Sequence, residues 1–125
     1  MFRQILIIGA GGFLGTVSRF LTSKYIQVYF PSSFPLGTFI INVLGCFLIG
    51  LFYGFSEKIS LVTPELRMFL TVGFCGGFTT FSTFANENLT MLRDAEFFYS
   101  LLYVGLSIFL GILAVYLGNL LTKII

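Results

Sequence analysis

The sequence predicts an all-α membrane protein with four transmembrane helices per subunit. Its 125 residues are 57% hydrophobic and only 10% charged, whereas a soluble domain carries about 25% charged residues. Charge-free windows lie at 4–18, 25–56, 68–86 and 97–122, and a spanning helix needs about 20 mostly apolar residues. Because the chain could not cover a water-facing surface, we expect a single four-helix transmembrane domain over residues 1–125 in a lipid bilayer.

The expected helices cover residues 3–24, 36–56, 66–91 and 97–122. The first is extended past Arg19, because a long basic side chain can snorkel toward an interface. Pro31 and Pro35 place a loop before the second helix. The polar connections SEKISLVTPELR and RDAE separate the remaining spans. The protein is therefore expected to cross the membrane several times.

The basic residues give almost no orientation signal. With an even number of spans, one side holds four of them and the other side three: Arg3, Lys58, Arg67 and Lys123 against Arg19, Lys24 and Arg93. Orientation follows an excess of Lys and Arg on the cytoplasmic side. The near balance favours insertion both ways, called dual topology, with a single orientation set by other details as the alternative. The charged residues behind the net charge of +2 are scattered along the sequence and form no basic patch. The sequence therefore does not indicate nucleic-acid binding.

Several small residues predict close helix contacts. Pairs spaced by four residues lie on three of the expected helices: Gly11 and Gly15, Gly50 and Gly54, and Ser107 and Gly111. Such spacing lets helix backbones approach closely in a membrane. Since four short helices enclose little room for a pathway, we expect a homo-oligomer.

The N-terminal stretch ILIIGAGGFLG imitates a dinucleotide-binding turn without its context. A nucleotide fold needs an acidic residue about 20 residues further on, but the first acidic residue is Glu57. A parallel sheet also cannot expose its edges in lipid. Cys46 and Cys75 lie in apolar segments and are expected to be small buried hydrophobes, and the chain has no histidine. The sequence does not predict an enzyme.

The stretch TVGFCGGFTTFSTFANEN carries polar residues through the third span. Gly76 and Gly77 each weaken a helix by about 1 kcal/mol relative to alanine, and the side chains of Thr79 and Thr80 compete for backbone hydrogen bonds. This pattern predicts a break near the middle of the span. Freed carbonyls there suit a cation such as Na⁺, and the alternative is a simple kink whose carbonyls are satisfied.

Phenylalanines and neutral donors gather around the same segment. Phe78, Phe81 and Phe84 recur every three residues, and the edges of their rings carry partial positive charge. Neutral hydrogen-bond donors accompany them on three helices: Asn42, Ser82, Thr83, Tyr103 and Ser107. No Lys or Arg lies deep among these positions, and weak binding suits an ion that must also leave. The pattern therefore indicates conduction of an anion.

Glu87 is the only carboxylate inside an expected span. An intramembrane ionisable group indicates a functional site by default. The alternative is a structural acceptor close to the membrane interface.

Three motifs together resemble the Fluc, or CrcB, family of fluoride channels. They are GGFLGTVSRF, PLGTFIINVLGCFLIG and GFCGGFTTFSTFANE, and the resemblance covers nearly the whole chain. It implies a passive channel that exports fluoride across the bacterial plasma or inner membrane to relieve fluoride toxicity. It also implies an antiparallel, dual-topology homodimer with two fluoride pores and a central structural Na⁺.

The resemblance also assigns roles to individual residues. The backbone carbonyls of Gly76 and Thr79 would hold Na⁺. The fluoride pathway would take contacts from Asn42, Phe81 and Phe84, a polar track of Ser82, Thr83, Tyr103 and Ser107, the pore-region carboxylate Glu87, and Arg19 near an aqueous vestibule. On the fourth span, Gly111 stands where some members of the family have another hydroxyl.

Two other functions were compared with the channel. A small dual-topology multidrug-type antiporter needs a membrane carboxylate, usually in its first span, and this first span has none. A non-transporting assembly subunit would not need neutral donors on three helices. Both comparisons favour the channel.

Overall fold

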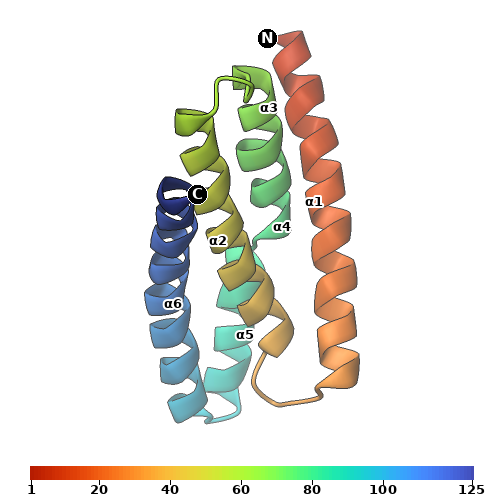
Figure 1. Ribbon diagram of the computed structural model, residues 1–125. Coiled ribbons are helices and arrows are strands. Elements are labelled where there is room, and N and C mark those ends of the chain that lie inside the picture. The colour runs from red at the N-terminus through yellow and green to blue at the C-terminus, as the bar shows by residue number, and fades with distance from the viewer.

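Four long apolar helices make up the protein. The computed structural model describes residues 1–125 and contains no strand. Helix α1 (Phe2–Tyr29), helix α2 (Leu36–Lys58), the composite third segment Pro64–Arg93 and helix α6 (Phe97–Ile124) are each long and apolar enough to cross a membrane. They stand side by side as a bundle (Figure 1), in which α1 packs along the third segment and α6 packs along α2. The expectation of an all-α, four-span membrane protein is confirmed.

The first helix is longer than the sequence predicted. It continues to Tyr29, five residues past the expected end, and stops at Phe30. No glycine or proline interrupts residues 25–29, and the rings of Tyr25 and Tyr29 stack with their centroids 6.3 Å apart. The helix ends before Pro31, because a following proline disfavours helical backbone in the residue that precedes it. The other three spans match their expected ends to within two residues.

The third span is assembled from several pieces. Helix α3 (Pro64–Met68) leads into a π-helical stretch, η1 (Phe69–Cys75), and then into the single turn α4 (Gly76–Phe78). Thr79 and Thr80 then have extended backbone, with φ/ψ of −93°/158° and −149°/122°, before helix α5 (Phe81–Arg93) begins.

Threonines, rather than glycines, have the non-helical backbone. Gly76 and Gly77, which were expected to weaken the helix, are themselves helical. Thr79 donates its hydroxyl to the Cys75 carbonyl at 2.9 Å, and Thr80 caps α5 by accepting from the Thr83 N–H at 3.2 Å. A threonine that caps a helix has non-helical backbone itself. The capping bond therefore explains why α5 starts afresh at Phe81.

Two of the predicted small-residue pairs lie where helices of the same chain pack closely. A Cβ on Gly11 would lie 2.5 Å from the Phe69 carbonyl oxygen, and a Cβ on Gly15 would meet the Phe74 carbonyl, so α1 packs directly on η1. Gly50 and Gly54 likewise let α2 pack directly on α6. A Cβ on Gly50 would meet Val115, and a Cβ on Gly54 would meet Thr122. The spacing correctly indicated close contact, but these four glycines join helices of one subunit.

The third small-residue pair, Ser107 and Gly111, and the two cysteines lie where α2, the third segment and α6 meet. A Cβ on Gly111 would stand 3.4 Å from the Cys46 sulfur. Cys75 is buried, as expected, whereas Cys46 is only half-buried. Cys46 is partly exposed because it lines a cavity of about 400 Å³.

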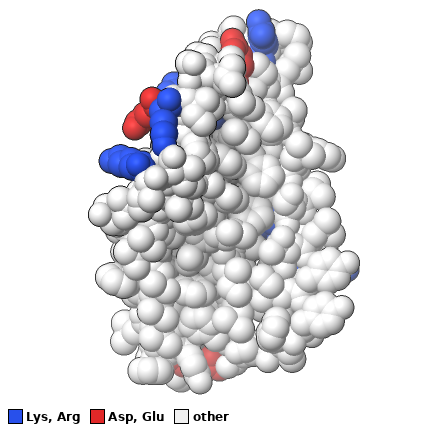
Figure 2. Space-filling model, viewed as in Figure 1, with Lys and Arg blue, Asp and Glu red and all other residues white.

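Most charged side chains lie near the ends of the bundle, whereas Arg19 and Glu87 bond to groups between its helices. On the face shown in Figure 2, Lys and Arg gather mainly near the end that holds the N-terminus in Figure 1, and the wall between the ends is almost free of charge. An uncharged wall of this kind is what the hydrocarbon core of a bilayer requires. The protein is thus a multi-pass membrane protein.

Candidate functional site

Side chains from two neighbouring helices hold the break in the third segment. The Thr80 N–H donates to Asn42 Oδ1 at 2.8 Å, and Asn42 Nδ2 donates to the Thr80 carbonyl at 3.0 Å. From the other side, Arg19 Nε on α1 donates to the Gly77 carbonyl at 2.9 Å. The amide of Asn42 thus replaces backbone partners that a continuous helix would have supplied.

Backbone carbonyls at the break lose their helical partners, those of Gly76 and Thr79 among them. The Thr80 N–H bonds to Asn42 instead of Gly76, and the Thr83 N–H bonds to the Thr80 hydroxyl instead of the Thr79 carbonyl. Both Gly76 and Thr79 line the same cavity, and Gly76 is exposed. The carbonyls of Gly77 and Phe78 also lack their helical partners, and the Gly77 carbonyl accepts from Arg19 instead. The two predicted cation ligands are therefore among the residues whose helical hydrogen bonds are missing.

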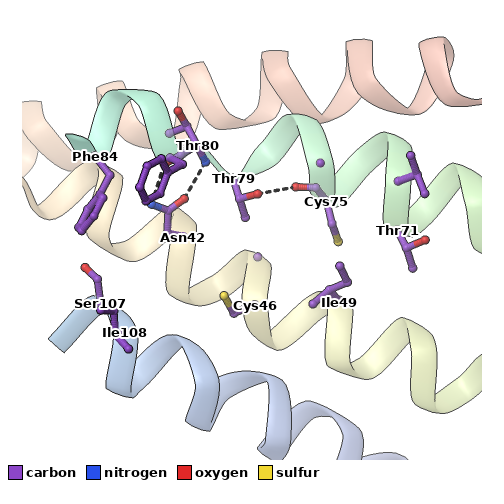
Figure 3. A pocket seen from close by; sticks show the side chains of 14 residues that line it. Asn42, Cys46, Ile49, Thr71, Cys75, Thr79, Thr80, Phe84, Ser107 and Ile108 are labelled. Atoms are coloured by element: carbon purple, nitrogen blue, oxygen red, sulfur yellow. Dashed lines mark hydrogen bonds between the residues drawn. The ribbon is translucent and has the colours of Figure 1, made fainter. Parts of the chain in front are cut away.

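A cavity of about 400 Å³ lies beside the break, between α2, the third segment and α6. Figure 3 shows its lining side chains. Six of the predicted site residues contribute to it: Asn42, Gly76, Thr79, Phe81, Phe84 and Ser107. The hydroxyl of Ser107 is buried and has no hydrogen-bond partner. Buried polar groups are almost always paired, so the Ser107 hydroxyl is an available donor in the wall of this cavity.

A second cavity, of about 330 Å³, lies between α1, α2 and the start of α5. Arg19 and Thr83 line it, as do Lys24, Gln27 and Thr38. Two cations therefore face this space, whereas no Lys or Arg lines the first cavity.

Thr80 lines both cavities. Its hydroxyl is within 3.2 Å of the Thr83 hydroxyl and 3.4 Å of the Ser82 hydroxyl. The hydroxyls at the start of α5 therefore form a group that borders both spaces.

Glu87 is held by two hydroxyls away from both cavities. The Thr38 hydroxyl donates to Glu87 Oε2 at 2.9 Å, and the Tyr103 hydroxyl donates to Oε1 at 2.8 Å. The ring of Phe84 packs on Tyr103 with centroids 4.8 Å apart. The carboxylate thus joins α2, α5 and α6 beside the phenylalanine.

The sequence interpretation missed Thr38. It lies one turn before Asn42 on the same face of α2, because residues four apart on a helix are neighbours. Its donation to Glu87 is fixed by how α2 and α5 pack. The four-residue spacing from Asn42 was the available signal.

Ser82 and Phe81 lie on the open side of the site. The side chain of Ser82 is exposed and lines neither cavity, and Phe81 is 79% exposed although it lines the first cavity. A single chain therefore leaves one side of the predicted pathway uncovered.

The chain is similar to known membrane proteins over nearly its whole length. The model of a family described as "CrcB-like protein, Camphor Resistance (CrcB)" matches residues 6–119. A protein of Flavobacterium psychrophilum is 46% identical over 97% of this chain and 98% of its own length. A protein of Chlorobium phaeobacteroides is 48% identical over 98% of this chain and 95% of its own length.

A protein of Bacteroides fragilis is also 48% identical, over 94% of each chain. All three relatives carry the name fluoride-specific ion channel FluC, which describes a channel and not an enzyme. With the family model covering most of the sequence and relatives aligned almost end to end, this chain belongs to the CrcB family.

Proposed function

We propose that this protein is a passive, fluoride-selective channel that exports fluoride across the bacterial cell membrane and so relieves fluoride toxicity. The name shared by its relatives supports this proposal. The observation that carries it is the unpaired, buried hydroxyl of Ser107, in a cavity also lined by Phe81 and Phe84. A neutral donor beside ring edges suits a small anion that has left its water behind.

The first cavity offers several weak replacements for water. Asn42 Nδ2 carries two N–H groups, and the Thr80 carbonyl accepts from only one of them. The second N–H, the Ser107 hydroxyl and the edges of Phe81 and Phe84 are the proposed contacts to fluoride. Since no Lys or Arg lines this cavity, the anion is not trapped, and conduction requires a site that an ion can also leave.

The second cavity is the proposed aqueous entrance. Arg19 and Lys24 face it, and positive side chains in a hollow raise the local concentration of anions. Thr80, which borders both cavities, connects this entrance to the phenylalanines, with Ser82 and Thr83 extending the polar track. Glu87 accepts two hydroxyl bonds, which supports a role in fixing Tyr103 beside the track.

An inverted second copy is the proposed cover for the open side of the site. Lipid does not tolerate non-helical backbone unless protein or a wet cavity covers it, yet the extended residues Thr79 and Thr80 are only half-buried in one subunit. Their neighbours Gly76 and Phe81 are exposed. The near balance of basic residues between the two sides favours insertion both ways. The proposed assembly is an antiparallel, dual-topology homodimer with two pores.

A structural Na⁺ is proposed at the centre of this dimer. The Gly76 and Thr79 carbonyls lack their helical partners, and both residues line the open cavity. Uncharged carbonyl oxygens at a helix break are suitable Na⁺ ligands. On a two-fold axis, a pair of carbonyls from each copy would share one ion. The ion would join the subunits, while fluoride passes along the polar track.

Fluoride efflux from liposomes tests the proposal. Purified protein is reconstituted into vesicles loaded with potassium fluoride or potassium chloride, and valinomycin balances the charge. We expect rapid fluoride efflux without a proton gradient and little chloride efflux. Equal release of both anions, or no release beyond that of protein-free vesicles, would contradict a fluoride-selective channel.

A further inference from the structure

A buried polar pair joins α5 to α6 next to the proposed pathway. The Ser100 hydroxyl donates to Asn88 Oδ1 at 2.9 Å, and Asn88 Nδ2 donates to the Phe84 carbonyl at 2.9 Å. Ser100 is 6% exposed and Asn88 is half-buried. Asn88 thus binds both the neighbouring helix and the backbone of the residue that bears the Phe84 ring.

This pair forms a second connection beside that of Glu87. Glu87 and Asn88 are adjacent on α5, and their partners Tyr103 and Ser100 are one turn apart on α6. Neither Asn88 nor Ser100 lines either cavity. Any effect of the pair on a passing ion must therefore act through other residues.

Helix α5 needs such connections because it is not continuous with α4. The extended residues Thr79 and Thr80 separate the two helices, so the helical backbone of α4 does not set the rotation of α5 about its own axis. That rotation decides where the rings of Phe81 and Phe84 point, since both lie in the first turn of α5.

We propose that Asn88 and Ser100 are positioning residues that fix the rotation of α5 against α6. They hold the Phe84 ring against Tyr103, where the centroids are 4.8 Å apart. This inference rests on the proposed fluoride conduction. Its consequence is that loss of the Asn88–Ser100 hydrogen bond slows fluoride passage through channels that remain folded.

The test measures unitary fluoride current in planar bilayers, which is independent of how many channels have folded. The variants are Asn88→Ala, Ser100→Ala and the double variant. Hydrogen bonds between membrane helices contribute about 0.6–1.7 kcal/mol, so we expect the current of each single variant to fall by a factor of roughly 3 to 18. Because Ser100 acts through its bond to Asn88, whereas Asn88 also bonds to the Phe84 carbonyl, the double variant should lose about as much as Asn88→Ala alone.

Thr90→Ala is the matched control. Thr90 is exposed on the same helix, and its hydroxyl bonds only within that helix, to the Asn86 carbonyl at 3.1 Å. We expect parental current from this variant. Detergent stability of each dimer is measured in parallel, to compare folding with conduction.

Each result supports or overturns the inference. If the parent protein conducts fluoride and both single variants have the same unitary current as the parent, the positioning role is overturned and the proposed function stands. Losses that multiply in the double variant overturn the pairing. Fewer active channels with unchanged unitary current would show a merely structural bond. A parent without fluoride current overturns the proposed function, and this inference with it.

Discussion

The side chain of Asn42 combines two tasks in one amide. Its oxygen and one of its N–H groups bind the backbone of Thr80, and the second N–H is left for the proposed anion. An ionised aspartate would face the Thr80 carbonyl with an acceptor and would also repel fluoride. Serine keeps a donor but is too short to reach both Thr80 groups.

Asn42→Asp should therefore impair fluoride flux more than Asn42→Ser. Removal of one partner leaves the other backbone group unsatisfied, at a cost of about 1–3 kcal/mol, so both variants should lose flux. Initial efflux rates from vesicles with equal amounts of protein provide the measurement. If both variants show the same flux, Asn42 does not face the ion.

Phe81→Ile and Phe84→Ile should each reduce fluoride flux by up to about tenfold. Isoleucine keeps apolar bulk but removes the ring edge, and aromatic edge interactions are worth roughly 0.5–1.5 kcal/mol. Phe81 is 79% exposed in one chain, so its replacement should not disturb folding. Phe84 packs on Tyr103, and isoleucine keeps apolar bulk at that contact, so this subunit should still fold. Efflux and the size-exclusion peak of the proposed dimer are compared for each variant. Parental flux in both would remove the rings from the mechanism.

Residue types predicted much of the site, and tertiary contacts supplied the rest. Ser107, Phe81 and Phe84 were candidates because hydroxyls and aromatic rings at these spacings suit a weakly bound anion, and all three line the first cavity. The pairing of Thr38 with Glu87 could not, because it depends on how α2 meets α5. The same holds for Arg19, whose bond to the Gly77 carbonyl depends on the distance of α1 from the break.

At the scale of elements, glycines set how closely α1 approaches η1. A Cβ on Gly15 would meet the Phe74 carbonyl and would lie 3.0 Å from the Phe78 nitrogen, whereas a Cβ on Gly9 would meet nothing within 4 Å. The same substitution on one helix should therefore have opposite effects.

Gly15→Ala should destabilise the protein by about 1–3 kcal/mol, the usual cost of overpacking. Gly9→Ala should be neutral or stabilising by up to about 1 kcal/mol, because alanine favours helix over glycine. The folded fraction across an SDS titration in mixed micelles measures both. Equal loss of stability in the two variants would contradict the close contact between α1 and η1.

Hydropathy located the four spans but not the internal structure of the third. Apolar length decides whether a segment can cross a bilayer, and three spans therefore matched to within two residues at each end. The π-helical η1 and the extended Thr79 and Thr80 depend on hydrogen bonds to Asn42 and within the turn. The sequence pointed to Gly76 and Gly77 as well as to Thr79 and Thr80, but the two glycines are helical because α-helix tolerates glycine at a modest cost.

At the scale of the whole molecule, Na⁺ should stabilise the proposed dimer. A ligand that binds only the assembled state stabilises it by mass action, by about 2.7 kcal/mol at one hundred times its dissociation constant. Subunit dissociation in detergent is measured across a Na⁺ series at constant ionic strength, with Li⁺ or a large organic cation as replacement. We expect dissociation to fall as Na⁺ rises.

Two substitutions test whether the proposed ligands, Gly76 and Thr79, are responsible for the Na⁺ dependence. Thr79→Ser keeps the backbone carbonyl and should keep the Na⁺ dependence. A Cβ on Gly76 would find only the Thr71 carbonyl oxygen at 3.9 Å, and Gly76 has helical backbone. Gly76→Val should therefore fold as a subunit and lose Na⁺-dependent dimerisation by crowding the partner. A dissociation curve that stays flat after the dimer is separated and reassembled without Na⁺ would rule out the site.

The Thr80 N–H, bonded at 2.8 Å to a side chain on another helix, has a consequence for spectroscopy. Slow hydrogen exchange at most helical amides reports the opening of the helix itself, but exchange at Thr80 would report separation of α2 from the third segment. A single amide resonance in an NMR spectrum could therefore follow the integrity of the break in lipid nanodiscs. Its exchange rate would distinguish conditions that loosen this junction from those that unfold the surrounding helices.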